Sequence, residues 1–163
     1  MATKTKAKKK IVAKKKRTTG PRAASTRPIE REQPESLRVR ALTNSLTVND
    51  LEASIRWYRD VVGFMVEGDI VRNGVRTGAR LKAGTMVLRL GQDDWSKGRD
   101  RVKGVGQRFY LSTDQDIDKI AARIKASGGT LDSEPESFPQ YGVRAFSITD
   151  PQGFGFTISK PLD

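Results

Sequence analysis

The side chains of this sequence that could do chemistry are hydroxyls, arginines and carboxylates, because the chain contains no histidine and no cysteine. This composition excludes a Ser, His and Asp catalytic set and a thiolate nucleophile, and it leaves only a perturbed carboxylate or tyrosine as a general base. Asp93 and Asp94 form a conspicuous pair of carboxylates. Adjacent carboxylates repel each other, so we expect them to be solvated or to form salt bridges with the nearby Lys97 and Arg99.

The end of the sequence places one hydroxyl on a predicted strand. Residues 150–153, Asp-Pro-Gln-Gly, predict a tight turn in which Asp150 hydrogen-bonds the backbone. After the turn, Phe154, Phe156 and Ile158 alternate with Gly155, Thr157 and Ser159. Because side chains alternate between the two faces of a strand, the apolar set packs on a core and the second set faces a more polar space. Thr157 is therefore a candidate for ligand binding.

Other candidate ligand contacts are arginines and aromatic residues. Arg108 and Tyr110 share one face of a predicted strand, whereas the alternate residues are apolar. An arginine on such a face can bind a carboxylate or phosphate through two hydrogen bonds, or it can pair with a carboxylate at a rim or dimer interface. Trp95 and Tyr141 fall in predicted loops that could close a cleft over a planar ligand, or they could serve packing or an interface.

The elements that must position these residues repeat in one order. A strand near 39–48 is followed by a helix capped by Asn49 or Asp50 and ended by Gly63, then by strands at 64–72, 75–83 and 85–91, the first two joined across Asn73-Gly74. The second half has a strand at 107–113, a helix at 114–128 and strands at 130–137, 143–149 and 154–160. The sequence thus predicts an α+β fold of two βαβββ modules that form a cleft.

Two stretches, "VNDLEASIRWYRDVVGF" and "RAFSITDPQGFGFTIS", at this separation resemble the vicinal oxygen chelate superfamily, which includes glyoxalase I, bleomycin-resistance proteins and extradiol dioxygenases. The resemblance spans roughly residues 37–161, and "LRLGQDDWSKGRDRVKGVGQRFYLST" is similar to many glyoxalase-like bacterial proteins. It implies a cleft that binds a small molecule, and commonly a homodimer. It does not imply one particular reaction.

Members of this superfamily that use a metal place one ligand on each of four strands, usually His or Glu. The resemblance puts the matching positions at Thr43, Arg108 and Thr157, with the fourth at Val87 or Arg89. Hydroxyls are weak neutral ligands and a guanidinium repels a cation. We therefore expect no metal and no cofactor, and we take Thr43, Arg89, Arg108 and Thr157 as ligand-binding candidates instead.

The start of the chain is strongly basic. Residues 1–32 hold eight lysines, four arginines and two glutamates, a net charge of +10, so only two of the formal +12 charges belong to the rest. We expect residues 1–36 to form a disordered tail and linker, and residues 37–163 to form the domain. The tail could be a solvated solubility segment, could contact an anionic membrane surface, or could bind nucleic acid without reading bases. The tail residues expected at nucleic acid are Lys8, Lys9, Lys10, Lys14, Lys15, Lys16 and Arg17.

Three functions remain open at this point. The first is a glyoxalase- or bleomycin-resistance-like protein that binds a small neutral or anionic molecule without a metal. The second is a lyase, isomerase or dioxygenase-related enzyme of the same superfamily, and the third is a nucleic-acid-associated protein tethered by its tail. The sequence lacks a run of about 18 apolar residues and a secretory signal. Together with the absence of cysteine, this leads us to expect a cytoplasmic protein with no membrane span.

Overall fold

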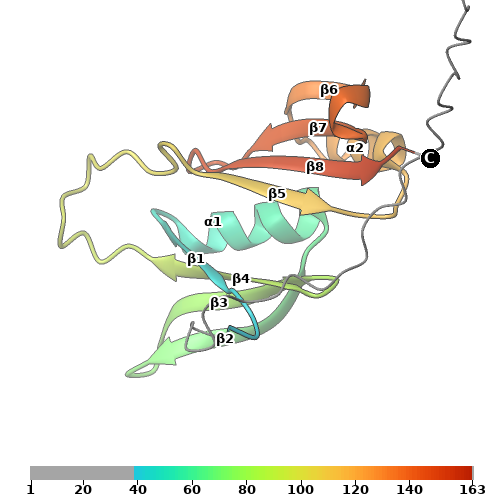
Figure 1. Ribbon diagram of the computed structural model, residues 1–163. Helices are drawn as coiled ribbons and strands as arrows, with labels where there is room; N and C mark the ends of the chain where they lie inside the picture. Colours follow the sequence, from blue (N-terminus) through green and yellow to red (C-terminus); the bar gives the residue numbers. More distant parts are fainter. Residues whose placement is uncertain (1–38, 163) are drawn as a thin grey trace, which may run out of the picture. The chain divides into compact units, whose positions relative to one another are not determined.

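Two copies of one strand order build residues 39–162, the part of the chain that this computed structural model describes (Figure 1). The first copy, module 1, contains β1 (Asn44–Val48), α1 (Leu51–Arg56), the π-helical η1 (Trp57–Val62), β2 (Met65–Arg72), β3 (Val75–Ala83) and β4 (Met86–Gln92). Its sheet has the order β1-β4-β3-β2, with β1 parallel to β4 and the other pairs antiparallel.

Module 2 repeats this topology. It contains β5 (Arg108–Ser112), α2 (Ile117–Ala126), β6 (Leu131–Phe138), the short 3-10 helix η2 (Pro139–Tyr141), β7 (Val143–Thr149) and β8 (Gly155–Pro161). Its sheet has the matching order β5-β8-β7-β6, with β5 parallel to β8. The predicted α+β fold of two βαβββ modules is therefore confirmed. The predicted tail, residues 1–36, lies outside the described residues.

Local sequence signals begin and end these elements as expected. The Asp50 side chain accepts a hydrogen bond from the Ala53 amide at 2.9 Å and caps α1, and Gly63 ends the helical segment at φ 95°. Asn73 and Gly74 have φ of 50° and 75°, which matches the twist of a two-residue hairpin turn between β2 and β3. At the β7–β8 turn, Asp150 accepts hydrogen bonds from the amides of Gln152 and Phe154, as predicted.

The first strand is shorter than its alternating pattern predicts. It begins at Asn44 rather than near Val39, and Val39 and Leu42 are exposed. In the register with β4, Asn44 lies opposite Leu88, and β4 itself starts only two residues earlier at Met86. Continuing this parallel register would place Leu42 opposite Met86, so residues 39–41 have no β4 residue on which to continue the ladder.

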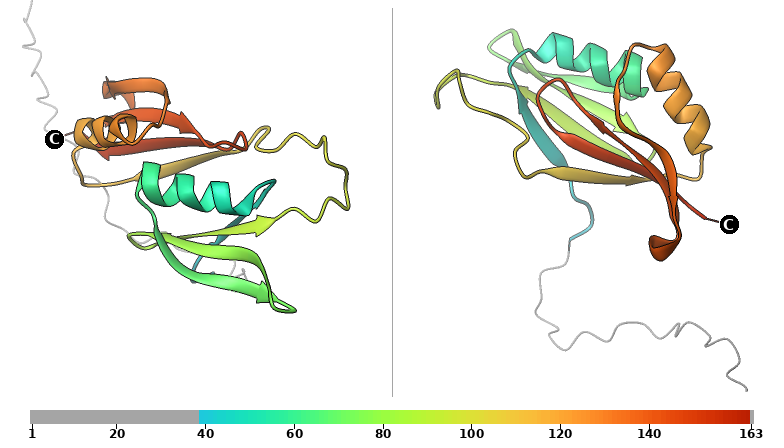
Figure 2. Two further views of the ribbon diagram at one scale, coloured as in Figure 1. Left: turned by 180° about the vertical axis from the view of Figure 1, so that it is seen from behind. Right: turned by 90° about the horizontal axis from the view of Figure 1, so that it is seen from above.

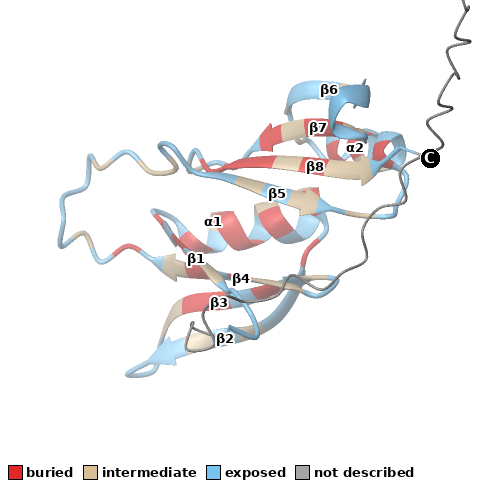
Figure 3. Cartoon of the chain, viewed as in Figure 1, coloured by how far each residue is buried: buried red, intermediate tan, exposed pale blue. Residues whose placement is uncertain are grey.

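One hydrophobic core joins the two modules. Figure 3 shows buried residues in α1 and α2 and in strands of both sheets. Tyr58 from η1 contacts the rings of Phe64 and Phe156, and Phe156 in turn stacks on Phe109. The helical segments of the two modules also touch, because Arg123 of α2 donates to the Val62 carbonyl at 2.8 Å, and Figure 2 shows α1 and α2 next to each other. No helix within residues 39–162 is long and apolar enough to cross a membrane.

Candidate functional site

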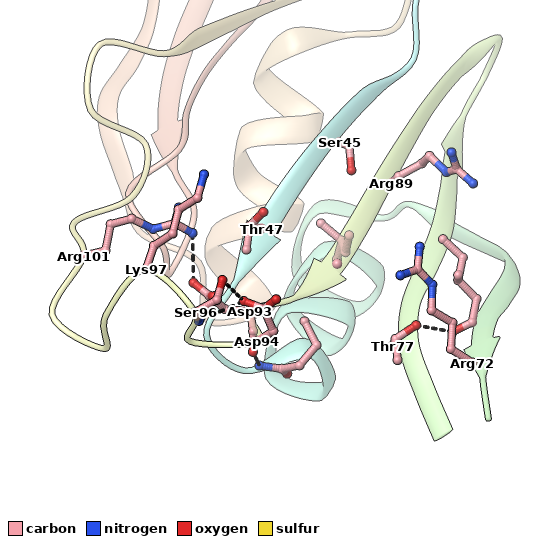
Figure 4. A pocket seen from close by; sticks show the side chains of 14 residues that line it. Ser45, Thr47, Arg72, Thr77, Arg89, Asp93, Asp94, Ser96, Lys97 and Arg101 are labelled. Carbon is pink, nitrogen blue, oxygen red and sulfur yellow. Dashed lines mark hydrogen bonds and ion pairs between the residues drawn. The ribbon is translucent and has the colours of Figure 1, made fainter. Parts of the chain in front are cut away.

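A pocket of about 510 Å³ lies over the exposed face of the first sheet, at the end where β4 leads into the long loop 93–107. This volume falls in the range of small-molecule sites, which runs from about 300 to 1,000 Å³. Figure 4 shows the strands on one side of the pocket and the loop on the other. The lining residues are Ser45, Thr47, Ile70, Arg72, Thr77, Arg89, Leu90, Gly91, Gln92, Asp93, Asp94, Ser96, Lys97 and Arg101.

Strand alternation places the polar residues at this pocket. In β1, Leu46 and Val48 are buried in the core, so Ser45 and Thr47 point to the opposite face. The register of β1 with β4 places Ser45 beside Arg89 and Thr47 beside Gly91. One face of two neighbouring strands therefore supplies two hydroxyls, one guanidinium and one position without a side chain.

Gly91 keeps the floor of the pocket open. Its φ lies outside the left-handed region, so the backbone does not require glycine there. A Cβ added at Gly91 would come no closer than 4.0 Å to any other atom, the nearest being the Leu46 carbonyl oxygen. A larger side chain at this position would thus occupy space in the pocket without displacing the strands.

The loop wall of the pocket is built around a buried carboxylate. Asp93 is only 5% exposed and accepts hydrogen bonds from Arg101 Nη2 at 2.9 Å, from Lys103 Nζ and from the Trp95 amide at 2.9 Å. The bond from Lys103, followed by the bonds from the Trp95 amide and from Arg101, lowers the pKa of Asp93 to about 2. Asp93 is therefore ionised at neutral pH.

The partners of the two carboxylates differ from those predicted. Lys97 and Arg99 form no salt bridge with Asp93 or Asp94 among the described residues; Asp93 pairs instead with Arg101 and Lys103. Trp95 in the same loop has φ of 60°, a left-handed conformation uncommon for residues other than glycine. Arg99 lies over the Trp95 ring, 4.9 Å from its centroid. Asp94 accepts hydrogen bonds from the Ser96 amide and hydroxyl, and these bonds lower its pKa.

Three cations at the pocket have no carboxylate partner. Arg72, Arg89 and Lys97 line it, and within residues 39–162 none of them forms a salt bridge or a side-chain hydrogen bond. By contrast, Arg80, the cross-strand neighbour of Arg89, pairs with Glu67 at 2.7 Å. Like charges directly opposite each other in a sheet repel, so an unpaired Arg89 beside Arg80 is unfavourable unless an anion offsets its charge.

Of the residues proposed from sequence, the pocket includes Arg89. Thr43 is exposed and precedes β1, and Trp95 lies in the loop beneath Arg99 without lining the pocket. Three others share the exposed face of the second sheet, where Arg108 donates to the Thr157 hydroxyl at 3.2 Å and Tyr110 is exposed. Tyr141 is exposed in η2. These residues stay predictions for ligand binding, outside this pocket.

Several pocket residues were missed. Ser45 and Thr47 follow Thr43 at two-residue intervals, so the alternation of the strand could have found them. Arg72, Thr77, Lys97 and Arg101 carry no such signal, because the twist of the sheet and the path of the loop decide whether they reach the pocket. Gly91 could not be distinguished from an ordinary strand glycine.

The residues at the pocket do not fit a divalent metal ion. Its lining includes two carboxylates, one of them already bound by Arg101 and Lys103, together with four cationic side chains. In the described part of the chain, no three acidic side chains gather closely enough to hold a metal. Divalent metal sites in proteins are built from imidazole, thiolate and carboxylate groups, and nearby guanidinium groups would oppose the ion.

Comparisons with known proteins agree with this fold. A sequence model described as "Glyoxalase/Bleomycin resistance protein/Dioxygenase superfamily" matches residues 39–158. No curated protein sequence matches the chain.

Solved structures of three other proteins share the arrangement. TioX from Micromonospora sp. ML1 has a TM-score of 0.61 and 18% identity, over 74% of this chain and 98% of that one. TnmS3, an antibiotic binding protein from Streptomyces sp. CB03234, has a TM-score of 0.60 and 23% identity, over 77% and 99%. A glyoxalase/bleomycin resistance protein/dioxygenase from Nocardioides has a TM-score of 0.61 and 18% identity, over 79% and 88%.

Proposed function

We propose that this chain, which belongs to the Glyoxalase/Bleomycin resistance protein/Dioxygenase superfamily, binds a small anionic molecule in the pocket of module 1 without using a metal ion. The observation that carries the proposal is the set of three unpaired cations, Arg72, Arg89 and Lys97, around a floor kept open by Gly91. Cations without a protein partner remain hydrated in the free protein. A bound carboxylate or phosphate then receives charge-assisted hydrogen bonds from them.

The charge of the lining argues against a cationic guest. Four cationic side chains and two carboxylates face the pocket, so a positively charged ligand would meet net repulsion. TnmS3 is described as an antibiotic binding protein, which supports small-molecule binding as the class of activity for a relative of this fold. The ligand of this chain has to be argued from its own pocket, since the fold alone does not fix it.

Binding is favoured over catalysis because the pocket lacks a suitable general base. Asp93 and Asp94 both have a pKa below the ordinary value for aspartate, so they are weak bases at neutral pH. The one carboxyl whose pKa is raised, within residues 39–162, is Asp150. It is buried against Tyr58 and does not line the pocket. A lyase or isomerase mechanism would therefore need a group that this pocket does not offer.

A valine at position 91 tests the proposal. Gly91→Val should narrow the pocket while fitting the strand, whereas Gly68→Val in β2 introduces the same side chain at a position that does not line the pocket and has nothing within 4 Å. Small anions would be screened by thermal shift and calorimetry against the full-length protein. Compounds that bind the wild type and Gly68→Val but not Gly91→Val support the proposal. If every bound compound is insensitive to Gly91→Val, the pocket is not the site.

Elemental analysis tests the metal-free part of the proposal. The protein purified without chelators should contain far less than one equivalent of zinc, nickel, manganese or iron. If the protein instead contains about one equivalent of metal, and Asp94→Asn loses it, the pocket is a metal site and this part of the proposal is wrong.

The basic tail supports a second candidate function. We propose that residues 1–32, with a net charge of +10, hold the protein on nucleic acid without base recognition. This proposal concerns a separate segment and is compatible with small-molecule binding by the domain.

A further inference from the structure

The charged side chains at the pocket lie on two sides of it. Figure 4 shows Arg72 and Arg89 on one side, across from Asp94 and Lys97. Arg72 belongs to β2 and Arg89 to β4, and no carboxylate of residues 39–162 pairs with either of them. The strand side of the pocket lining therefore offers an anionic group two guanidinium groups and no competing carboxylate.

Two hydroxyl groups lie on the strands next to this cationic side. Ser45 lies beside Arg89 in the sheet, and Thr47 lies beside Gly91, two residues further along β4. Both residues line the pocket, and neither hydroxyl forms a hydrogen bond with the part of the protein that the structure describes. Each of them can therefore bond a hydroxyl group of a ligand.

The loop side of the pocket adds a carboxylate oxygen. Asp94 Oδ1 accepts hydrogen bonds from the Ser96 amide at 3.0 Å and from the Ser96 hydroxyl at 2.7 Å. Among residues 39–162, no other residue donates a hydrogen bond to Asp94 Oδ2. An ionised carboxylate oxygen is a strong acceptor, so Asp94 can receive hydrogen bonds from the hydroxyl groups of a ligand.

Apolar surface is scarce at the pocket. Leu90 is buried in the core and Gly91 has no side chain, so Ile70 is the one aliphatic side chain of the described lining that a ligand can contact. A hydrophobic ligand would gain little from this surface. It would also displace water from hydroxyl and carboxylate groups without replacing the lost hydrogen bonds, which is unfavourable.

We propose that the ligand is a polyhydroxylated anion, a chain of hydroxyl-bearing carbons with one anionic group, such as a sugar acid or a sugar phosphate. This inference rests on the proposed function of the pocket. The anionic group binds Arg89. The hydroxyl groups bind Ser45, Thr47 and Asp94. Arg89 and Gly91 lie about 7 Å apart along β4, so a six-carbon chain is long enough to reach from Arg89 to Thr47. The missing side chain at Gly91 leaves room for the chain beside Thr47.

Calorimetry with three six-carbon probes tests this ligand class. Gluconate carries both hydroxyls and a carboxylate, hexanoate carries only the carboxylate, and glucitol carries only hydroxyls. On the full-length protein we expect gluconate to bind at least about tenfold more tightly than either of the others, because each of these loses hydrogen bonds to a charged side chain. Glucitol 6-phosphate distinguishes the two sources of the anionic group. Its binding more tightly than gluconate would identify a sugar phosphate, and the reverse order a sugar acid.

Thr47→Val tests where the hydroxyl groups bind, because valine has the same shape and lacks the hydroxyl. We expect the affinity for gluconate to fall about threefold to tenfold, with no change for hexanoate. Thr85→Val is the matched control, since Thr85 is exposed in the β3–β4 turn and does not line the pocket, and it should change neither affinity. Arg89→Gln should remove most of the preference for gluconate over glucitol.

Several results would overturn the inference. Equal binding of gluconate and hexanoate by the wild type would show that the hydroxyl groups are not recognised, and equal binding of gluconate and glucitol would show the same for the anionic group. Thr85→Val acting like Thr47→Val would place the hydroxyl contacts elsewhere. If neither gluconate nor glucitol 6-phosphate binds while another anion binds in a Gly91-dependent way, this inference is wrong and the proposed function stands. If no compound shows Gly91-dependent binding, both are wrong.

Discussion

Tyr58 Oη donates a hydrogen bond to Asp150 Oδ2 at 2.7 Å, and this bond ties the helical segment of module 1 to the β7–β8 turn of module 2. Asp150 is 4% exposed, and its other oxygen accepts from the amides of Gln152 and Phe154. Burial raises the pKa of Asp150, and the hydrogen bonds from Tyr58 and the turn oppose the rise. The same turn reaches module 1 again, because the Gln152 side chain accepts from the Asn49 amide at 2.9 Å.

Replacing Tyr58 by phenylalanine should destabilise the domain by about 1–3 kcal/mol at neutral pH, because a buried carboxylate loses a donor. The pKa of Asp150 should rise further in the variant. When the pKa of a carboxyl is higher in the folded than in the unfolded state, the protein becomes less stable as pH rises above the unfolded pKa of about 4. The cost of Tyr58→Phe should therefore be larger at pH 7 than at pH 4. Urea unfolding at both pH values measures this, with Tyr141→Phe, at an exposed tyrosine, as the control. A cost that is the same at both pH values would show that Asp150 does not respond to the bond.

Asp93 should show the opposite pH dependence. Lys103, Trp95 and Arg101 lower the pKa of Asp93 in the folded state to about 2. The contribution of Asp93 to the stability of the fold is therefore complete above the unfolded pKa of about 4, and it disappears as pH falls from about 4 to about 2. Thermal unfolding should therefore show Asp93→Asn to be less stable than the wild type at pH 7, with the difference vanishing near pH 2. Asp100→Asn, in the exposed part of the same loop, is the control and should change the midpoint little at any pH. A difference that persists at pH 2 would mean that packing, and not the charge, causes the loss.

The sequence predicted the features that depend on neighbouring residues and missed those that depend on distant ones. The cap at Asp50, the helix end at Gly63 and the hairpin at Asn73-Gly74 each follow from a few adjacent residues, and each is present. The pairing of Asp93 with Lys103 requires the whole loop to fold back, which residue spacing alone does not encode. Proximity in sequence favoured Lys97 and Arg99 as salt-bridge partners, and for Asp93 this was wrong, whereas Asp94 is exposed to solvent, the other alternative.

The candidate site was likewise predicted only in part. The resemblance to the superfamily gave Val87 or Arg89 as one cleft position, and Arg89 lines the pocket. Sheet register and the path of the loop decide which strand positions line the pocket. The prediction therefore named Thr43, whereas Ser45 and Thr47 lie at the pocket. The open floor at Gly91 depends on the absence of atoms, which a linear sequence cannot indicate.

Alanine at Gly104 should loosen the loop wall of the pocket. A Cβ on Gly104 would lie 2.1 Å from the carbonyl oxygen of Gly153, so the loop would have to move away from the β7–β8 turn. Gly106 has a similar φ, 71° against 73°, and a Cβ there would meet nothing within 4 Å. Both alanines share the strain of a left-handed conformation, about 1 kcal/mol, so the extra loss in Gly104→Ala measures the close contact alone. We expect that extra loss to be about 1–3 kcal/mol in urea unfolding. Equal losses in the two variants would show that the loop gives way easily and does not fix Lys97 and Arg101.

Deleting residues 1–32 should abolish most binding to nucleic acid while leaving the domain folded. The segment carries a net charge of +10 and has few apolar residues, so it can neutralise phosphates but cannot add to a hydrophobic core. We expect the full-length protein to bind duplex DNA of unrelated sequences with similar affinity, since lysines read no bases. If about six phosphates are neutralised, the slope of log K against log salt should be about −5.

Fluorescence anisotropy measures the affinity and its salt dependence. Thermal unfolding of the two forms, with midpoints within a few degrees, verifies the fold. Equal DNA binding by both forms would place the contact on the domain, where the cations around the pocket become the candidates. The absence of binding by either form at low salt would reduce the tail to a solubility segment.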